Sequence, residues 1–394
     1  MGNKSSSIFI PRIFRRRRNR TPAAEIFPEE IMEEILLRLP VKSLLKFRCV
    51  SKSWCSLISS NRFIKAHLKI SIKDTNNFTR QNIISTFSPP GKILKQCSLS
   101  SLFYGLGTTN AVDVDFPIRN PNDSVRVVGS CNGLICTILN EKLIYLWNPS
   151  TRKFKKLPNA DDRIKVISKY GFGFDECNED YKVLVVVSSF CIGGGFETMV
   201  KIYSLRTNSW KRIEDLAHDC LFGSTGKFVS GKLHWVRRSG PNHSARWDIV
   251  SFDLGSEICG SVALPHYFGT GSSPSLEVLG ECLCVLGHIP KIEMVVWVLK
   301  EYGVTNSWAR ILRVTNSWAR ISSVSYGRRS NLRRESPLLT PFGIGQEGKI
   351  LLMIGSRFMI YNPRNNCFRP PRIMNFGGSL EPPHVYCESL VEIV

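Results

Sequence analysis

The stretch FPEEIMEEILLRLPVKSLLKFRCVSKSWCSLISS, residues 27–60, carries apolar side chains at the spacing of short helices. Ile31, Ile35 and Leu39 recur at steps of four with glutamates between them, which is the pattern of an amphipathic helix. Pro40 should end that helix because the residue before a proline is disfavoured in the helical region. Helices of about ten residues are too short to be stable alone. We therefore expect this segment to need a partner for its spare apolar surface.

Three residues indicate where the helices of this stretch begin. Pro28 is expected at the first helical position, where its missing N–H costs nothing. Ser43 is expected to cap a second helix and Ser51 a third, because serine side chains accept hydrogen bonds from the free amides of a first turn. The sequence thus predicts a small all-α module of three helices ahead of the rest of the chain.

These residues resemble an F-box, through Phe27-Pro28, the apolar helix, Leu39-Pro40 and RCVSKSW at residues 48–54. Phe27 stands where that family usually has leucine. The resemblance implies that residues 25–70 dock on a Skp-family adaptor, and through it on a cullin, so that the chain is the substrate receptor of a ubiquitin ligase. It implies adaptor contacts for Phe27, Pro28, Ile31, Leu39, Pro40, Val41, Leu44, Leu45, Val50 and Trp54. The alternative, that Leu44, Val50 and Trp54 only form the core of the module, stays open.

The composition is that of a soluble globular protein, with 394 residues, 43% hydrophobic and 22% charged, enough for two or three domains. The 13 cysteines include no C-x-x-C pair, which favours reduced thiols in the cytosol or nucleus. The histidines show no metal-ligand spacing, so no metal or other cofactor is predicted. No apolar run is long enough to span a membrane. Because the sequence holds no nucleophile elbow, phosphate loop or H-E-x-x-H motif, we predict a non-catalytic protein.

From about residue 80 onwards, short apolar runs are separated by Gly, Asn, Asp and Pro turns, which indicates strands. One two-strand unit recurs five times at intervals of 45 to 64 residues. Such periods are typical of a β-propeller. Residues 80–394 are therefore predicted to form an all-β propeller-like domain of six blades, with seven left open, closed by strands from both ends of the region. The repeated position is occupied by Trp147, Tyr203, Phe252, Trp297 and Tyr361.

The octapeptide VTNSWARI at residues 304–311 is repeated at residues 314–321. We interpret this as a local duplication or a gene-model error. Its two tryptophans, Trp308 and Trp318, cannot both occupy the same blade position, so one of them should be displaced. The basic segment 320–337 that follows is predicted to be a disordered loop.

The strand region resembles the F-box-associated domain of plant F-box proteins, through GSCNGLICTI at residues 129–138, LWNPSTRKFKKLP at 146–158 and YGFGFDECNEDYKVL at 170–184. It is only kelch-like, because the Gly-Gly doublet of true kelch repeats is absent. Within these motifs Asn132-Gly133 predicts a hairpin turn. Asn148 predicts a turn, and Gly171 and Gly173 predict turns or close packing between strands. The sequence does not indicate which residues bind a substrate.

Basic residues dominate the charge of the chain, whose formal net charge is +21. Residues 1–24 contain seven lysines and arginines and no acid, and are predicted to be a disordered basic tail. Such charge favours an acidic substrate or an anionic membrane surface. Nucleic acid is a less favoured partner because no nucleic-acid-binding module accompanies the arginines.

The first residues, MGNKSS, fit the myristoylation pattern, with Gly2 as the acceptor. One acyl chain binds membranes only marginally, but the run Arg15–Arg18 would add electrostatic attraction to an anionic leaflet. The competing interpretations are a nuclear localisation signal and a leader without function. We therefore expect a substrate receptor of an SCF-type (Skp, cullin, F-box) ligase in the cytoplasm or nucleus, or at the plasma membrane. The alternative is a non-degradative F-box scaffold at a membrane.

Overall fold

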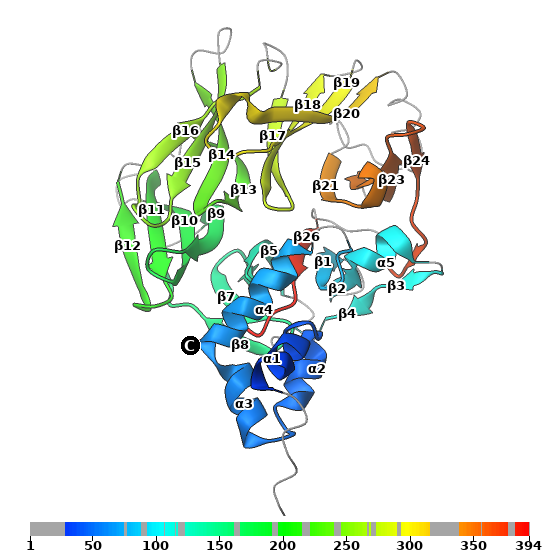
Figure 1. Cartoon of the computed structure of the whole chain (residues 1–394). Helices are drawn as coiled ribbons and strands as arrows, with labels where there is room; N and C mark the ends of the chain where they lie inside the picture. The colour runs from blue at the N-terminus through cyan, green and yellow to red at the C-terminus, as the bar shows by residue number, and fades with distance from the viewer. Residues whose placement is uncertain are drawn as a thin grey trace, which may run out of the picture.

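A computed structural model of the chain has helices at its N-terminal end and strands over most of the remainder (Figure 1). It describes residues 28–74, 77–87, 93–105, 107–114, 116, 123–160, 166–190, 196–214, 221–239, 246–265, 268, 273–289, 293–315, 339–355, 357–376 and 383–393. The predictions for Gly2, the tail 1–24, Phe27, Trp318 and the loop 320–337 lie outside the described residues.

Four helices precede the strands, where three were predicted. They are α1 (Glu29–Leu37), α2 (Val41–Phe47), α3 (Lys52–Ser59) and α4 (Asn61–Lys73). The apolar pattern did not predict α4, because the buried residues of this helix are Phe63, His67 and Ser71, of which only the first is apolar.

The helix starts follow the capping residues only in part. Ser51 caps α3 as predicted, since its side chain accepts a hydrogen bond from the amide of Trp54. Pro28 precedes α1 as its N-cap instead of occupying the first helical position. The second helix begins at Val41 after Pro40, ahead of Ser43, because an extended proline can end one helix and lead directly into the next.

Four of the sheets among the described residues have four strands each, and neighbouring strands within each are antiparallel. The first contains β1 (Gln81–Phe87), β2 (Ile93–Ser98), β4 (Val112–Asp113) and β26 (His384–Cys387). The second contains β5 (Val125–Cys131), β6 (Leu134–Leu139), β7 (Leu143–Asn148) and β8 (Lys153–Lys156). The third contains β17 (Ser273–Leu279), β18 (Cys282–Ile289), β19 (Glu293–Leu299) and β20 (Trp308–Thr315). The fourth contains β21 (Leu339–Ile344), β22 (Ile350–Ile354), β23 (Arg357–Asn362) and β24 (Cys367–Arg369).

A fifth sheet has eight strands, and this is where the sheets differ from the predicted six or seven separate blades. One half contains β9 (Val166–Asp175), β10 (Asp180–Phe190), β11 (Phe196–Ser204) and β12 (Ser209–Ile213). The other contains β13 (Leu221–Val229), β14 (Lys232–Ser239), β15 (Arg246–Asp253) and β16 (Cys259–Val262). A parallel bridge between Thr225 and Tyr170 joins the halves. The spacing of repeats in the sequence could not show this backbone contact.

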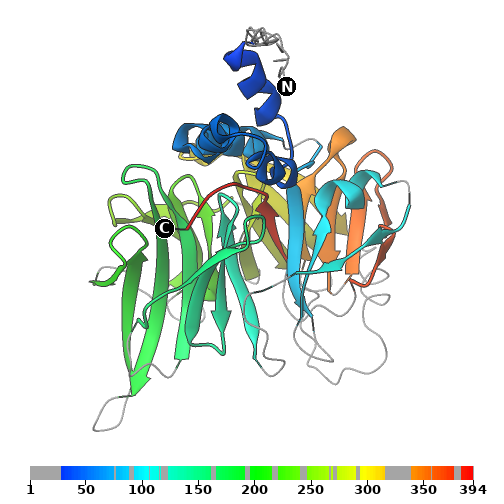
Figure 2. The same ribbon diagram turned by 90° about the horizontal axis from the view of Figure 1, so that it is seen from below.

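The sheets are arranged in a ring (Figure 1), and the helices α1–α4 lie on one face of it (Figure 2). Strands from both ends of the region close the ring, as predicted, because β26 pairs with β1 in the register Gln81 to Cys387 through Ile84 to His384. A short helix, α5 (Leu99–Tyr104), and the paired strands β3 (Thr109–Asn110) and β25 (Ile373–Met374) complete the described elements near this closure.

The repeated aromatic position is confirmed. Each of the five residues lies on the third strand of a four-stranded unit, on β7, β11, β15, β19 and β23 in chain order. Trp308 lies on the outer strand β20, where its indole N–H donates to the carbonyl of Ala263 at 2.9 Å. Trp210 of β12 makes the same contact with Pro158 at 2.8 Å, so the first copy of the duplication occupies a repeated position.

Two glycine predictions are also explained by packing and backbone geometry. A Cβ added to Gly173 would lie 2.2 Å from Cδ2 of Phe228, and one added to Gly171 would lie 2.5 Å from Cδ1 of Leu233. Asn132 and Gly133 both have positive φ, 53° and 82°, in the turn from β5 to β6, which confirms the predicted hairpin.

Candidate docking surface on the helical module

The helical module exposes large apolar side chains that the rest of its sequence does not cover. On α1, Ile31 is 49% exposed and Ile35 is 46% exposed, and Val50, just after α2, is 61% exposed. Single exposed apolar residues are ordinary. Together with Ile70 of α4, which is 41% exposed, these three residues offer apolar surface that a partner could remove from water.

The interior of the module explains why Ile31 and Ile35 of α1 lie outside. Seven side chains from different segments form its buried core: Leu36, Leu37, Val41, Leu44, Ile58, Phe63 and Leu390. On α1 it is therefore the adjacent pair Leu36 and Leu37 that faces inward, whereas the stripe of Ile31 and Ile35 faces solvent.

The residues predicted to contact an adaptor fall into three groups. Pro28, Ile31, Pro40 and Val50 are exposed. Leu39, Leu45 and Trp54 are half-buried and pack against the core of the module. Val41 and Leu44 have at most 1% of their surface exposed, so we exclude these two from a contact surface: their place is the core.

Trp54 shows how a half-buried residue can belong to both groups. Its ring meets that of Phe47 edge-on, with centroids 5.5 Å apart, a favourable aromatic geometry. The remaining exposed part of the indole is available to a partner. Core packing and partner contact, the two alternatives for Trp54 in the sequence, are therefore compatible.

Arg80 ties the module to the ring and was not singled out from the sequence. Its guanidinium, on the approach to β1, donates to the hydroxyl of Ser71 at 2.7 Å and to the carbonyl of Leu37 at 3.0 Å. Nearby, Nε2 of His67 donates to the carbonyl of Leu39 at 2.9 Å. Burial lowers the pKa of His67 to about 4, so its imidazole is neutral at physiological pH. These bonds satisfy carbonyls at the end of α1.

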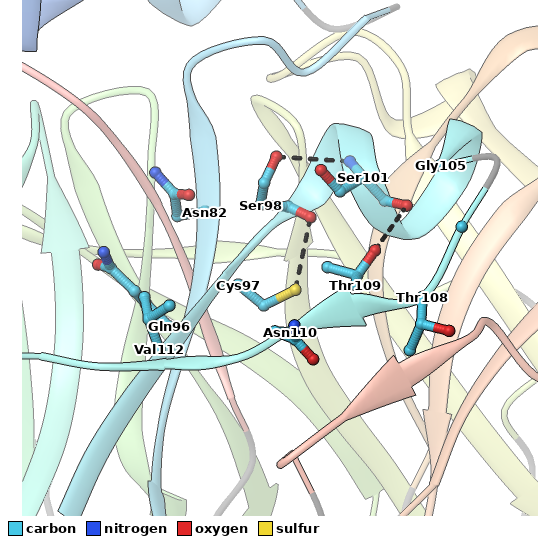
Figure 3. A pocket seen from close by; sticks show the side chains of 11 residues that line it. Asn82, Gln96, Cys97, Ser98, Ser101, Gly105, Thr108, Thr109, Asn110 and Val112 are labelled. Carbon is cyan, nitrogen blue, oxygen red and sulfur yellow. Dashed lines mark hydrogen bonds between the residues drawn. The ribbon is translucent and has the colours of Figure 1, made fainter.

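A pocket of about 510 Å³ lies in the first sheet, between β1, β2 and the segment that leads from α5 to β4 (Figure 3). Uncharged polar side chains dominate its lining, among them Asn82, Gln96, Ser98, Ser101 and Thr109. Thr109 donates to the carbonyl of Ser101 at 3.3 Å, and Ser98 accepts from the Ser101 amide at 3.4 Å. These bonds hold the wall of the pocket together.

Cys97, in the lining of this pocket, is a poor nucleophile. Burial raises the pKa of Cys97 to about 12, so it remains a thiol at neutral pH, and the thiolate is the reactive form. Across the described part of the chain no group of three or more His, Cys, Asp or Glu side chains could hold a metal ion. The described helices include none that is long and apolar enough to cross a membrane.

Two family descriptions match the chain over the regions just described. Residues 25–66 match the F-box domain, and residues 107–393 match the F-box associated beta propeller domain. The second match covers most of the chain. This chain is an F-box protein of the family that carries this propeller domain. The F-box match ends within α4, which continues to Lys73.

Curated relatives come from Arabidopsis thaliana and place this F-box protein among those of plants. The F-box/kelch-repeat protein At3g23880 is 30% identical over 378 residues, which are 92% of this chain and 95% of the relative. The F-box protein CPR1 is 31% identical over 313 residues, 73% of this chain and 72% of the relative. Among solved structures, an oligogalacturonate lyase in complex with manganese aligns with a TM-score of 0.42 and 8% identity over 75% of this chain and 76% of that chain.

Proposed function

We propose that this F-box protein is the substrate-recognition subunit of an SCF-type ubiquitin ligase. Its F-box would bind a Skp-family adaptor, and through it a cullin, while its propeller holds a target protein. The observation that carries the proposal is the exposed apolar group on the F-box, Ile31, Ile35 and Val50. Covering these side chains with an adaptor would remove apolar surface from water, which is favourable at roughly 25 cal/mol per Å².

The mechanism proposed for this chain is proximity. It would supply no reacting group. A target bound to the propeller would be presented at a high effective concentration to a ubiquitin-charged enzyme elsewhere in the assembly. Burial raises the pKa of Cys97 and keeps it protonated, so this thiol of the described pocket is not proposed as a nucleophile.

We propose that the target docks on the face of the ring away from the F-box. Glu179, in the turn between β9 and β10, forms an ion pair with Lys65 of α4, so this end of β10 faces the helices. The strand then runs for 11 residues from Asp180 to Phe190, and its far end therefore lies at the opposite face. Loops at the rim of a rigid scaffold are where binding residues commonly occur.

We also propose that the two halves of the eight-stranded sheet act as separate blades. Each half is a four-stranded unit in the same antiparallel order as the other sheets. Together with the four separate sheets they would give six blades around the ring, and loops of all six would then contribute to the target face.

The first experiment is a binding assay with the full-length chain. An Ile31→Glu variant should bind a purified Skp-family adaptor at least about tenfold more weakly than the wild type, because a carboxylate would be buried at an apolar contact. Ile258→Glu is the matched control, since Ile258 is 66% exposed on the propeller. It should bind as the wild type does.

Two results would contradict the proposal. If the folded wild-type chain fails to bind the adaptor, the F-box does not dock. The second result is that the adaptor binds, but replacing the wild type by Ile31→Glu in cells slows the turnover of no protein. The chain would then be a non-degradative scaffold and not a receptor.

For the N-terminal tail we propose membrane association through myristate on Gly2 and the basic run that follows. A Gly2→Ala variant should move from the membrane to the soluble fraction of cell extracts. An unchanged membrane fraction would reject the lipid anchor. A nuclear signal remains the competing proposal, and nuclear accumulation of both proteins would support it.

A further inference from the structure

The last described residues, Glu388–Ile393, pass between the F-box and the ring and contact both. In Figure 2 this segment runs from β26 across the face of the ring that carries the helices. Leu390 lies in the F-box core and is 1% exposed. Its neighbour Val391, and Ile393 beyond it, pack instead against a core cluster built by β5–β7 and β9–β11. Alternate side chains of one extended segment thus enter two different hydrophobic cores.

A buried asparagine of the ring holds the backbone of this segment. The amide nitrogen Nδ2 of Asn148 donates to the carbonyls of Ser389 at 3.1 Å and Val391 at 2.8 Å, and lies 3.3 Å from the Ser389 hydroxyl. Its oxygen Oδ1 accepts from the amide of Ser150 at 2.9 Å. Asn148 therefore makes the turn predicted from the sequence with one atom and binds the chain terminus with the other.

An ion-pair bridge crosses the same junction. Glu392 accepts from Arg48, which follows α2 in the F-box, at 3.2 Å, and from Lys153 of β8 at 2.8 Å. Hydrogen bonding to Lys153 and Arg48 keeps the pKa of Glu392 below its usual value, although partial burial opposes this. The carboxylate is thus charged at neutral pH and links one cation from each domain.

The β5–β6 turn leaves room for this segment only because it contains glycine. A Cβ on Gly133 would lie 2.2 Å from the hydroxyl oxygen of Ser389 and 2.7 Å from the carbonyl oxygen of Cys387. Neither atom could then remain in place. The turn and the terminus are packed against each other at backbone distance.

We propose that residues Glu388–Ile393 are a clamp that fixes the orientation of the F-box on the propeller. Asn148, Leu390 and Glu392 are positioning residues: none belongs to the exposed apolar group that we assign to the adaptor. The clamp does not depend on the proposed ligase function. If that function holds, the clamp sets the direction in which a bound target faces the rest of the assembly.

The test measures the distance between the domains with a zero-length cross-linker. A carbodiimide joins a lysine to a carboxylate only in direct contact, and Lys65 of α4 contacts Glu179 of the ring. In the full-length Asn148→Asp variant the carboxylate still accepts from Ser150 but no longer donates to the terminus. We expect the yield of the Lys65–Glu179 cross-link, quantified by mass spectrometry, to fall at least about fivefold because the donations to the carbonyls of Ser389 and Val391 are lost.

Asn208→Asp is the matched control, because Oδ1 of Asn208 accepts from the Tyr203 hydroxyl at 2.6 Å and a carboxylate can do the same. Its cross-link yield should equal that of the wild type. Should Asn148→Asp fail to fold, Glu392→Ala offers a milder route, since it removes only the partly exposed bridge to Arg48 and Lys153. It should lower the yield about twofold.

Unchanged Lys65–Glu179 cross-linking in folded Asn148→Asp and Glu392→Ala variants would overturn the clamp. The outcome for the proposed function is read separately, from adaptor binding by the wild type. If the wild type forms the Lys65–Glu179 cross-link but does not bind the adaptor, the ligase proposal is rejected and the clamp proposal stands.

Discussion

The F-box and the propeller bury their apolar residues in opposite ways. Each sheet of the ring shares a core cluster with a neighbour, as in the cluster that joins β18 and β19 to β22. The F-box has one small core, needs Leu390 from the other end of the chain to complete it, and still leaves Ile31 and Val50 exposed. The ring also exposes apolar side chains, such as Phe154 and Ile258, but neighbouring sheets complete its cores, whereas the core of the short helices needs a residue from outside the module.

The largest expected effect comes from a comparison of two buried leucines, one in each domain. Leu390→Ala should cost about 2–5 kcal/mol, the usual cost of such a cavity, and should release the F-box helices first. Leu233→Ala removes a side chain of matched burial from a core cluster of the ring and should loosen the eight-stranded sheet. Hydrogen exchange monitored by mass spectrometry would distinguish the two.

Faster exchange throughout the chain in Leu390→Ala would show that the two domains unfold as one unit. The contrast between a dependent F-box and an independent ring would then be lost.

A second variant acts on the ring alone. Gly173→Ala would place a methyl group 2.2 Å from the ring of Phe228, and overpacking of this kind costs about 1–3 kcal/mol. The urea midpoint of the full-length chain should fall, while adaptor binding per folded molecule should be unchanged. Gly231→Ala is not a suitable control because Gly231 has a φ of 74°. Gly129→Ala is suitable, since a Cβ there would meet nothing within 4 Å.

A third variant acts on the F-box alone. Ser51→Ala removes the side chain that accepts from the amide of Trp54 at 3.1 Å, and loss of such a cap costs about 1 kcal/mol. Exchange of the α3 amides should become faster, with no change in the strands. Ser56→Ala, a substitution of the same kind at an exposed serine within α3, should leave the cap intact. Equal effects of the two substitutions would show that the cap does not stabilise α3.

The smallest expected effect concerns acid stability of the ring. Burial of Asp253 opposes its ionisation, but hydrogen bonds from Lys232, Ser256 and Gly255 outweigh this and lower its pKa to about 2. Because the folded pKa lies below the unfolded value of 3.8, the stabilisation is complete above about pH 4 and is lost as the pH falls towards 2. Solvent screening should keep it below about 1 kcal/mol.

Comparison of urea midpoints at pH 7 and pH 2.5 checks this prediction. The loss on acidification should be smaller in Asp253→Asn than in the wild type. An identical loss would mean that Asp253 gains nothing from Lys232 in the folded state.

Sequence alone determined the features that depend on neighbouring residues. The F-box was evident from residues 27–60, the cap at Ser51 from one serine, and the hairpin at Asn132-Gly133 from the need for positive φ. The repeated aromatic position was also readable, because each unit satisfies the same local requirement of a buried third strand.

Tertiary structure decided which face of each element lies inside. Periodicity placed Ile31 and Ile35 on one stripe but could not tell that this stripe faces solvent while Val41 and Leu44 fill the core. Nor could it show the hydrogen bonds from Asn148 to a segment 241 residues away along the chain. Contacts at such separation leave no local pattern, because they arise only when the closed ring brings distant segments of the chain together.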